Sequence, residues 1–187
     1  MRALTYRGVL GILGALAAST ACASAQSTSA PPPAASPAAP SPDSSLPAWL
    51  VSDEAAETIT IALVVTPGPQ GPVINGARAG DLQVIVPLNW TVQWDWRSAD
   101  STAAHSLVVM EEREKLPTEG GRAVFTNAMT RMVVAGLPVG QVDRTTFTAE
   151  QAGWYWLLCG VPGHALGGEY IGLRVDPDAR TAGLKRK

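Results

Sequence analysis

The sequence predicts an all-β fold, a β-sandwich of about seven or eight short strands in a single domain. Two observations lead to this prediction. From about residue 58 onward, apolar residues alternate with polar ones at a period of two, which is typical of strands that bury one face. Short segments rich in Gly, Pro and Asn separate these runs, as tight turns require. We find no segment with the periodicity of a strong helix.

The expected strands follow one another along the chain. Three show the alternation clearly, with one-face residues Ile59, Ile61 and Leu63, then Leu82, Val84, Val86 and Leu88, then Trp90, Val92, Trp94 and Trp96. Four more are expected around residues 105–109, 145–148, 154–159 and 169–175. The tryptophans are expected to fill the core rather than to form a sugar-binding or redox stripe. Residues 111–142 are weakly periodic and are expected to form a long, partly ordered excursion.

The N-terminus resembles a secretory signal, which we assign to residues 1–25. Arg2 and Arg7 precede an apolar run, Val9–Ala18, that is too short to span a bilayer comfortably. Ala23-Ser24-Ala25 then provides small residues for cleavage. Two alternatives stay open: a retained membrane anchor, and lipidation at Cys22.

Composition divides the remainder of the chain into three parts. Residues 26–47 are almost entirely Ala, Pro and Ser and are expected to form a disordered linker. We expect the folded domain to span residues 48–178 and residues 179–187 to form a basic C-terminal tail.

Charge and rare residues limit the function. The chain has 14 basic and 16 acidic side chains, so it lacks the basic footprint of a nucleic-acid-binding protein. It has only two histidines and two cysteines, and cleavage of the signal would remove Cys22. An exported chain with one remaining cysteine, Cys159, cannot form an internal disulfide, and a bound metal would protect its thiol.

Cys159, His164 and His105 form a candidate metal site. The segment Gly160-Val161-Pro162-Gly163 favours a compact turn that would bring the His164 imidazole back towards the sulfur. His105 lies on a different expected strand, which a sandwich could place alongside. Each residue alone has an ordinary structural interpretation, but one thiolate and two imidazoles together are the ligand set of a trigonal copper site.

The segment "TFTAEQAGWYWLLCGVPG", followed by His164-Ala165, resembles the C-terminal half of a cupredoxin, most closely a sulfocyanin. Upstream, "INGARAGDLQVIVPLNWTVQWDW" and "HSLVV" resemble the first half of the same family. The resemblance implies a Greek-key sandwich that carries one copper ion, cycling between Cu(I) and Cu(II). It also implies His105, Cys159 and His164 as equatorial ligands, and a role for Ser106 in tying the two ligand strands together.

Glu169 departs from the family pattern, which has a methionine at this position as the axial ligand. Strand alternation places Glu169 on the inward face with Ile171, where an unpaired carboxylate is costly to bury. A copper ion would offset that cost, so Glu169 is a candidate fourth ligand that would favour Cu(II) and lower the reduction potential. The alternatives are a glutamate turned out to solvent, a site closed by the carbonyl of Ala104, or a methionine reaching over from the 111–142 excursion.

The predicted function is that of an exported, periplasmic or otherwise extracytoplasmic carrier of single electrons, with no catalytic residues. We expect a monomer, with an N-terminal membrane tether as an option. Its redox partner, a cytochrome or an oxidase, would dock near His164, where apolar residues surround the imidazole.

The same residues bear on three other functions. A copper enzyme would need histidines beyond the two present. A copper storage or delivery module, or a zinc site, is compatible with the same ligands. A thiol hydrolase using Cys159 and His164 lacks any recognisable oxyanion site.

Overall fold

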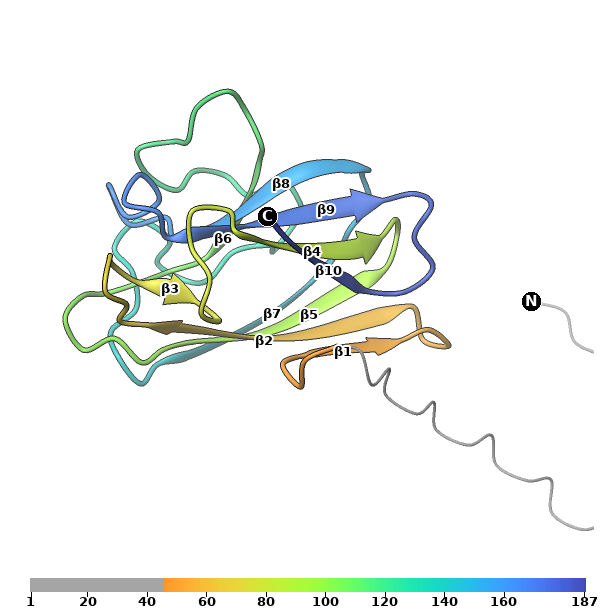
Figure 1. The fold of residues 1–187 in the computed structure, drawn as a ribbon, viewed down its shortest axis with the longest axis horizontal. Coiled ribbons are helices and arrows are strands. Elements are labelled where there is room, and N and C mark those ends of the chain that lie inside the picture. Colours follow the sequence, from red (N-terminus) through yellow and green to blue (C-terminus); the bar gives the residue numbers. More distant parts are fainter. Residues whose placement is uncertain (1–45) are drawn as a thin grey trace, which may run out of the picture. The chain divides into compact units, whose positions relative to one another are not determined.

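The computed structural model describes residues 46–187, which form two five-stranded sheets packed face to face (Figure 1). These residues contain ten strands and no helix, so the all-β prediction is confirmed. The expected signal segment and nearly all of the expected linker lie outside the described residues. Among residues 46–187 no helix has the length and apolar character needed to cross a membrane.

The first sheet has the order β1-β2-β5-β7, and a short strand, β3, pairs with β2. Its strands are β1 (Leu50–Asp53), β2 (Thr58–Thr66), β3 (Val73–Ile74), β5 (Thr91–Ser98) and β7 (Val142–Thr148). The second sheet has the order β10-β4-β9-β8-β6. Its strands are β4 (Leu82–Pro87), β6 (Val108–Glu111), β8 (Gly153–Leu158), β9 (Tyr170–Asp176) and β10 (Gly183–Arg186). Among the strands of residues 46–187, only β2–β5 and β4–β9 pair in parallel, as expected where chain crossovers connect two sheets.

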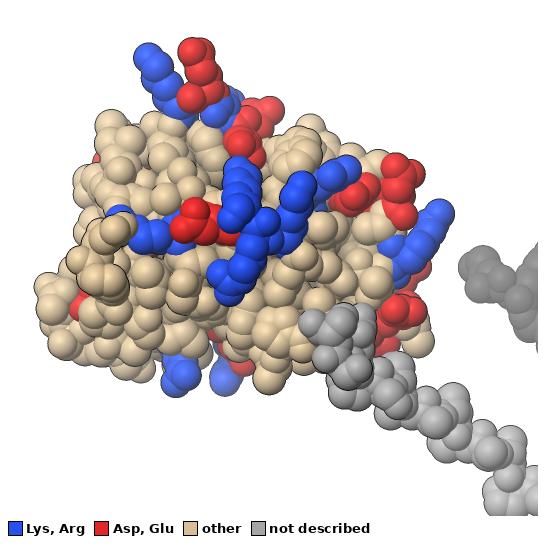
Figure 2. Space-filling view, in the orientation of Figure 1, with Lys and Arg blue, Asp and Glu red and all other residues tan. Residues whose placement is uncertain are grey.

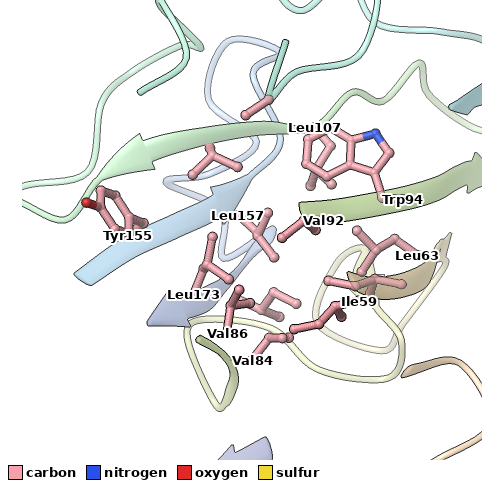
Figure 3. Close-up of a cluster of buried hydrophobic side chains, with 14 of the residues drawn as sticks. Ile59, Leu63, Val84, Val86, Val92, Trp94, Leu107, Tyr155, Leu157 and Leu173 are labelled. Carbon is pink, nitrogen blue, oxygen red and sulfur yellow. The ribbon is translucent and has the colours of Figure 1, made fainter. Parts of the chain in front are cut away.

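The alternating residues of both sheets fill the space between them. In β5, inward residues are buried and outward residues are exposed or partly exposed, as the period of two predicts. Trp94 and Trp96 are at most 1% exposed, which confirms that the tryptophans belong to the core. Figure 3 shows Val92 and Trp94 of β5 in one cluster with Leu157 of β8 and Leu173 of β9, so side chains from both sheets form a shared apolar core.

Three strands were not expected from the sequence, and all of them are short. β1 and β3 have four and two residues, too few for alternation to stand out. β10 lies within the segment expected to be a basic tail, but its backbone pairs with β4 along Gly183–Arg186. Leu184 packs against the core, but the basic run Lys185–Lys187 that follows it conceals its apolar signal, so the fold continues beyond residue 178.

The weakly periodic excursion packs closely against the sandwich. Phe125 and Ala128 are at most 1% exposed and belong to the main apolar cluster. The backbone of Leu137 exchanges two hydrogen bonds with that of His105, at 2.7 and 3.1 Å. This contact, rather than a place within a regular strand, fixes the backbone of His105, because β6 begins only at Val108.

Candidate metal centre

Four side chains with metal-binding atoms meet in one cluster. His105, Cys159, His164 and Glu169 each contribute one donor atom, and these atoms all lie within 4.8 Å of one another. His105 precedes β6, Cys159 directly follows β8, His164 lies in the loop between β8 and β9, and Glu169 directly precedes β9. The structure thus brings together all four residues selected from the sequence.

The loop between β8 and β9 is closed by its own backbone. The Cys159 N–H donates to the Glu169 carbonyl at 3.0 Å, and the Glu169 N–H donates to the His164 carbonyl at 3.0 Å. Gly163 has a φ of 81°, a conformation that favours glycine, and its N–H donates to the Thr118 carbonyl at 2.7 Å. These constraints place Nδ1 of His164 at 3.5 Å from the Cys159 sulfur, as the compact turn predicted.

Ser106 ties the two ligand-bearing segments to each other. Its Oγ accepts a hydrogen bond from the Gly160 N–H at 2.9 Å and donates one to the Val133 carbonyl at 2.6 Å. Its backbone N–H points at the Cys159 sulfur at 3.4 Å. Ser106 therefore fixes the Cys159 sulfur relative to the segment that carries His105.

Glu169 points into the site and not into solvent. Its side chain is 1% exposed, and both carboxylate oxygens lie 2.9 Å from Nδ1 of His105. One of them is also 3.1 Å from Nδ1 of His164. By contrast Met129 and Met132 of the excursion are 42% and 61% exposed. The structure therefore differs from the alternative in which the glutamate turns outward.

Without a metal, the buried carboxylate is balanced by His105. Burial opposes the charge on this imidazole, but hydrogen bonds to the Cys159 sulfur and the Glu169 carboxylate outweigh it and raise the pKa of His105 to about 10. The metal-free protein thus holds an imidazolium where a cation would otherwise sit. A metal ion that binds through Nδ1 must displace this proton.

A fifth buried polar side chain, Asp100, was not singled out in the sequence. Its Oδ2 lies 3.2 Å from Nε2 of His105, on the side of the ring away from Glu169. The side-chain and backbone hydrogen bonds from Thr102 hold the pKa of Asp100 below its usual value. Asp100 lies in an irregular loop, where the sequence has no strand or helix periodicity. The sequence therefore could not predict which way its side chain points.

One side of the cluster opens to a cavity of about 440 Å³. Its walls include His164, Glu169 and Asp100, together with residues 67–72 of the connection between β2 and β3. The His164 side chain is 25% exposed, whereas the other three members of the cluster are nearly or completely buried. The edge of this imidazole is therefore the part of the cluster that a second molecule can approach.

The donor set fits a copper ion. A soft thiolate and two imidazoles suit both Cu(I) and Cu(II), and a carboxylate adds a hard ligand that favours Cu(II). The same set would also satisfy zinc in a tetrahedral arrangement. Geometry alone thus indicates a mononuclear site for a transition metal with thiolate affinity.

Comparisons with known proteins identify a family model that matches most of the described residues. The sulfocyanin (SoxE) domain model matches residues 47–182. Rusticyanin from Thiobacillus ferrooxidans is similar in structure at 20% identity, with 64% of this chain and 82% of that one covered and a TM-score of 0.43. Auracyanin A, a "blue" copper protein from Chloroflexus aurantiacus, is similar at 17% identity, with 64% and 99% covered and a TM-score of 0.46. An auracyanin from Roseiflexus castenholzii is similar at 23% identity, with 63% and 97% covered and a TM-score of 0.47. The comparison with curated proteins gave no match.

Proposed function

The chain belongs to the sulfocyanin family of cupredoxins, and from that premise we propose that it is an exported protein that carries single electrons on one copper ion. The observation that carries the proposal is the cluster of one thiolate, two imidazoles and one carboxylate within 4.8 Å, at one end of a closely packed sandwich. We propose that His105, Cys159, His164 and Glu169 would hold this ion, with Glu169 at the position where the family pattern has a methionine. When bound, copper supplies a centre that gains and loses one electron between Cu(II) and Cu(I).

The protein's own contribution is to hold the donors in place and to exclude water. Cys159, His105 and Glu169 are at most 1% exposed, so solvent reaches them poorly. The donors lie on hydrogen-bonded segments, which limits rearrangement when the charge of the site changes by one. His164 remains partly exposed and is the proposed path by which the electron enters and leaves.

The donor inventory argues against catalysis. The chain has only two histidines, and both belong to the cluster. Oxygen-binding or nitrite-binding copper centres use further imidazoles, so we assign no catalytic residue. The role left is electron exchange with a redox partner such as a cytochrome or an oxidase, which would dock at the His164 end of a monomer.

Export is supported by the charged, apolar and small-residue segments of residues 1–25. In this proposal residues 26–47 form a linker that separates the domain from the signal or from a membrane tether. Mass spectrometry of the protein recovered outside the cytoplasm tests this. A chain beginning at Gln26 supports export with cleavage, and a chain that retains Met1 or carries lipid on Cys22 supports export with a membrane tether. Recovery of the protein in the cytoplasm alone would contradict export.

The electron-carrier proposal is tested by adding Cu(II) to the purified metal-free protein. We expect one equivalent to produce an intense visible charge-transfer band that ascorbate bleaches and ferricyanide restores. Cys159→Ser, checked for folding by circular dichroism, should lose the band. Binding of zinc with no such copper band would instead favour the zinc or storage alternative, because the same four donors accept tetrahedral zinc.

A further inference from the structure

Asp100 is a buried carboxylate that contacts the proposed metal site from outside the four-donor cluster. It is 2% exposed, and its Oδ2 faces Nε2 of His105 at 3.2 Å. Extending the proposed copper site, we propose that Asp100 is a positioning residue that holds the Nε2 proton of His105, so that Nδ1 is the nitrogen that gives up its proton to a metal. Asp100 would prepare His105 in this way for any metal that the site binds.

The two ring nitrogens of His105 face two different carboxylates. Nδ1 points into the cluster, 2.9 Å from both oxygens of Glu169, while Nε2 points at Asp100. The ring is completely buried, so no water can satisfy either nitrogen from bulk solvent. A neutral imidazole that gives its Nδ1 lone pair to a metal must carry its proton on Nε2, and a buried N–H requires an acceptor. Among the described residues with a recorded contact to Nε2, Asp100 supplies that acceptor.

Asp100 is itself held in a fixed orientation. Its Oδ1 accepts hydrogen bonds from the Thr102 backbone N–H at 2.8 Å and from the Thr102 hydroxyl at 2.6 Å. Its backbone N–H donates to the Ser98 hydroxyl, which lies at the end of β5, at 3.2 Å. These contacts occupy one carboxylate oxygen and leave the other to face His105. One short connection between β5 and β6 thus provides both a ligand and its support.

A carboxylate behind a ligating imidazole makes the ring a stronger donor and fixes its orientation, and losing such a partner costs about 10–100-fold in metal affinity. A stronger donor favours Cu(II) over Cu(I). Asp100 should therefore raise the affinity for divalent ions and lower the reduction potential of the copper site. These effects separate positioning from a purely structural role, which would change unfolding alone.

The variant Asp100→Asn tests the proposal, because an amide cannot both accept from His105 and keep both bonds from Thr102. Asp143→Asn is the matched control: Asp143 is also buried, but it binds Arg131 and no imidazole. Zinc alone serves as the first probe. We expect Asp100→Asn to bind zinc about 10–100-fold more weakly than the unaltered protein, and Asp143→Asn to stay within about twofold. Equal zinc affinity in a folded Asp100→Asn protein would overturn the proposal.

A second measurement needs no variant. In the zinc-loaded protein, ¹⁵N NMR of the histidine rings should show His105 with its proton on Nε2 and slow exchange of that proton with water. A proton on Nδ1 of His105 would overturn the proposal even if Asp100→Asn failed to fold. Since both measurements use zinc, they remain decisive if the copper band is absent and the electron-carrier proposal fails. If copper binds, Asp100→Asn should also raise the reduction potential, and an unchanged potential would contradict the inference.

Discussion

Glu169 is the residue that most distinguishes this site from the methionine-bearing pattern of its family. Its carboxylate is buried, and in the metal-free protein the raised pKa of His105 supplies the balancing positive charge. A metal ion bound through Nδ1 of His105 would take over that role. The carboxylate and the thiolate of Cys159 together would then match the two charges of Cu(II), and Cu(I) would leave one negative charge in excess.

The first prediction concerns the reduction potential. Glu169→Met removes the excess negative charge of the Cu(I) state, so we expect the potential to rise by about 60 mV or more, which corresponds to a tenfold change in relative affinity for one electron. Protein-film voltammetry of the copper-loaded proteins measures this shift. Glu150→Met, which alters an exposed glutamate away from the cluster, should leave the potential unchanged. A potential that is equal in Glu169→Met and in the unaltered protein would exclude Glu169 as a ligand.

The ligand residues could be predicted from the sequence because the chain has few residues with metal-binding side chains of these types. Two histidines and two cysteines left few possible combinations, and the short glycine-rich spacing of Cys159 and His164 indicated proximity. The role of Asp100 could not be predicted from the sequence, because aspartates are numerous and only the folded loop shows that this one faces His105.

At the scale of elements, the loop that carries His164 depends on a close approach of two backbones. The Gly160 carbonyl accepts a hydrogen bond from the Gly120 N–H at 2.8 Å. A Cβ on Gly160 would lie 2.4 Å from a methyl carbon of Val133 and 2.9 Å from the Val133 carbonyl oxygen. No side chain fits at this position unless the excursion moves away from the metal site.

We therefore expect Gly160→Ala to destabilise the metal-free protein by about 1–3 kcal/mol, as overpacking usually does. Urea denaturation monitored by tryptophan fluorescence provides the measurement. Gly121→Ala is the matched control, because its added methyl would meet only the flexible end of Met110 at 3.5 Å. Equal midpoints for the two variants would show that the excursion yields readily and does not brace the loop.

A second prediction at the scale of elements concerns the contribution of β10 to stability. Leu184 is partly buried against the core, whereas Lys185 is exposed. Leu184→Ala should lower the free energy of unfolding by about 1–2 kcal/mol through lost apolar burial. Lys185→Ala should change it by less than about 0.5 kcal/mol. If neither change is measurable by urea denaturation, residues 183–186 contribute nothing to stability and the pairing with β4 is incidental.

The strands that could be predicted from the sequence are longer and more regular than those that could not. In β2 and β5, which have nine and eight residues, the alternation of buried and outward-facing side chains repeats often enough to be read directly. β3, with two residues, cannot display a period, and β10 has a single apolar residue that is followed by basic ones. The excursion buries Phe125 and Ala128 without regular spacing, so its packing follows from tertiary contacts that no local pattern records.

At the scale of the whole folded unit, the two loops beside the site carry few charged side chains of their own. Residues 160–168 contain none apart from the titratable His164, and residues 67–72 contain none. The Arg78 guanidinium joins these loops by donating to the carbonyls of Gln70 and Gly167. Several other Lys and Arg side chains gather around the end of the chain near β10 (Figure 2). A small apolar rim around a partly exposed imidazole suits brief docking, because little surface must be desolvated and released at each encounter.

A charge placed on that rim should therefore slow electron exchange without changing the metal site. Leu166 is 56% exposed, two residues beyond His164. In Leu166→Glu, two copies that meet through this face bring like charges together, so we expect the self-exchange rate between reduced and oxidised protein to fall by about tenfold. NMR line broadening in mixtures of the two redox states measures this rate. Added salt should restore part of the lost rate, because screening acts within about 10 Å at 0.1 M.

The control variant Val51→Glu adds the same charge on β1, at a side chain that is 46% exposed, and should leave the self-exchange rate unchanged. If both variants slow exchange equally, the electron does not pass through the face around His164, and the effect reflects net charge alone.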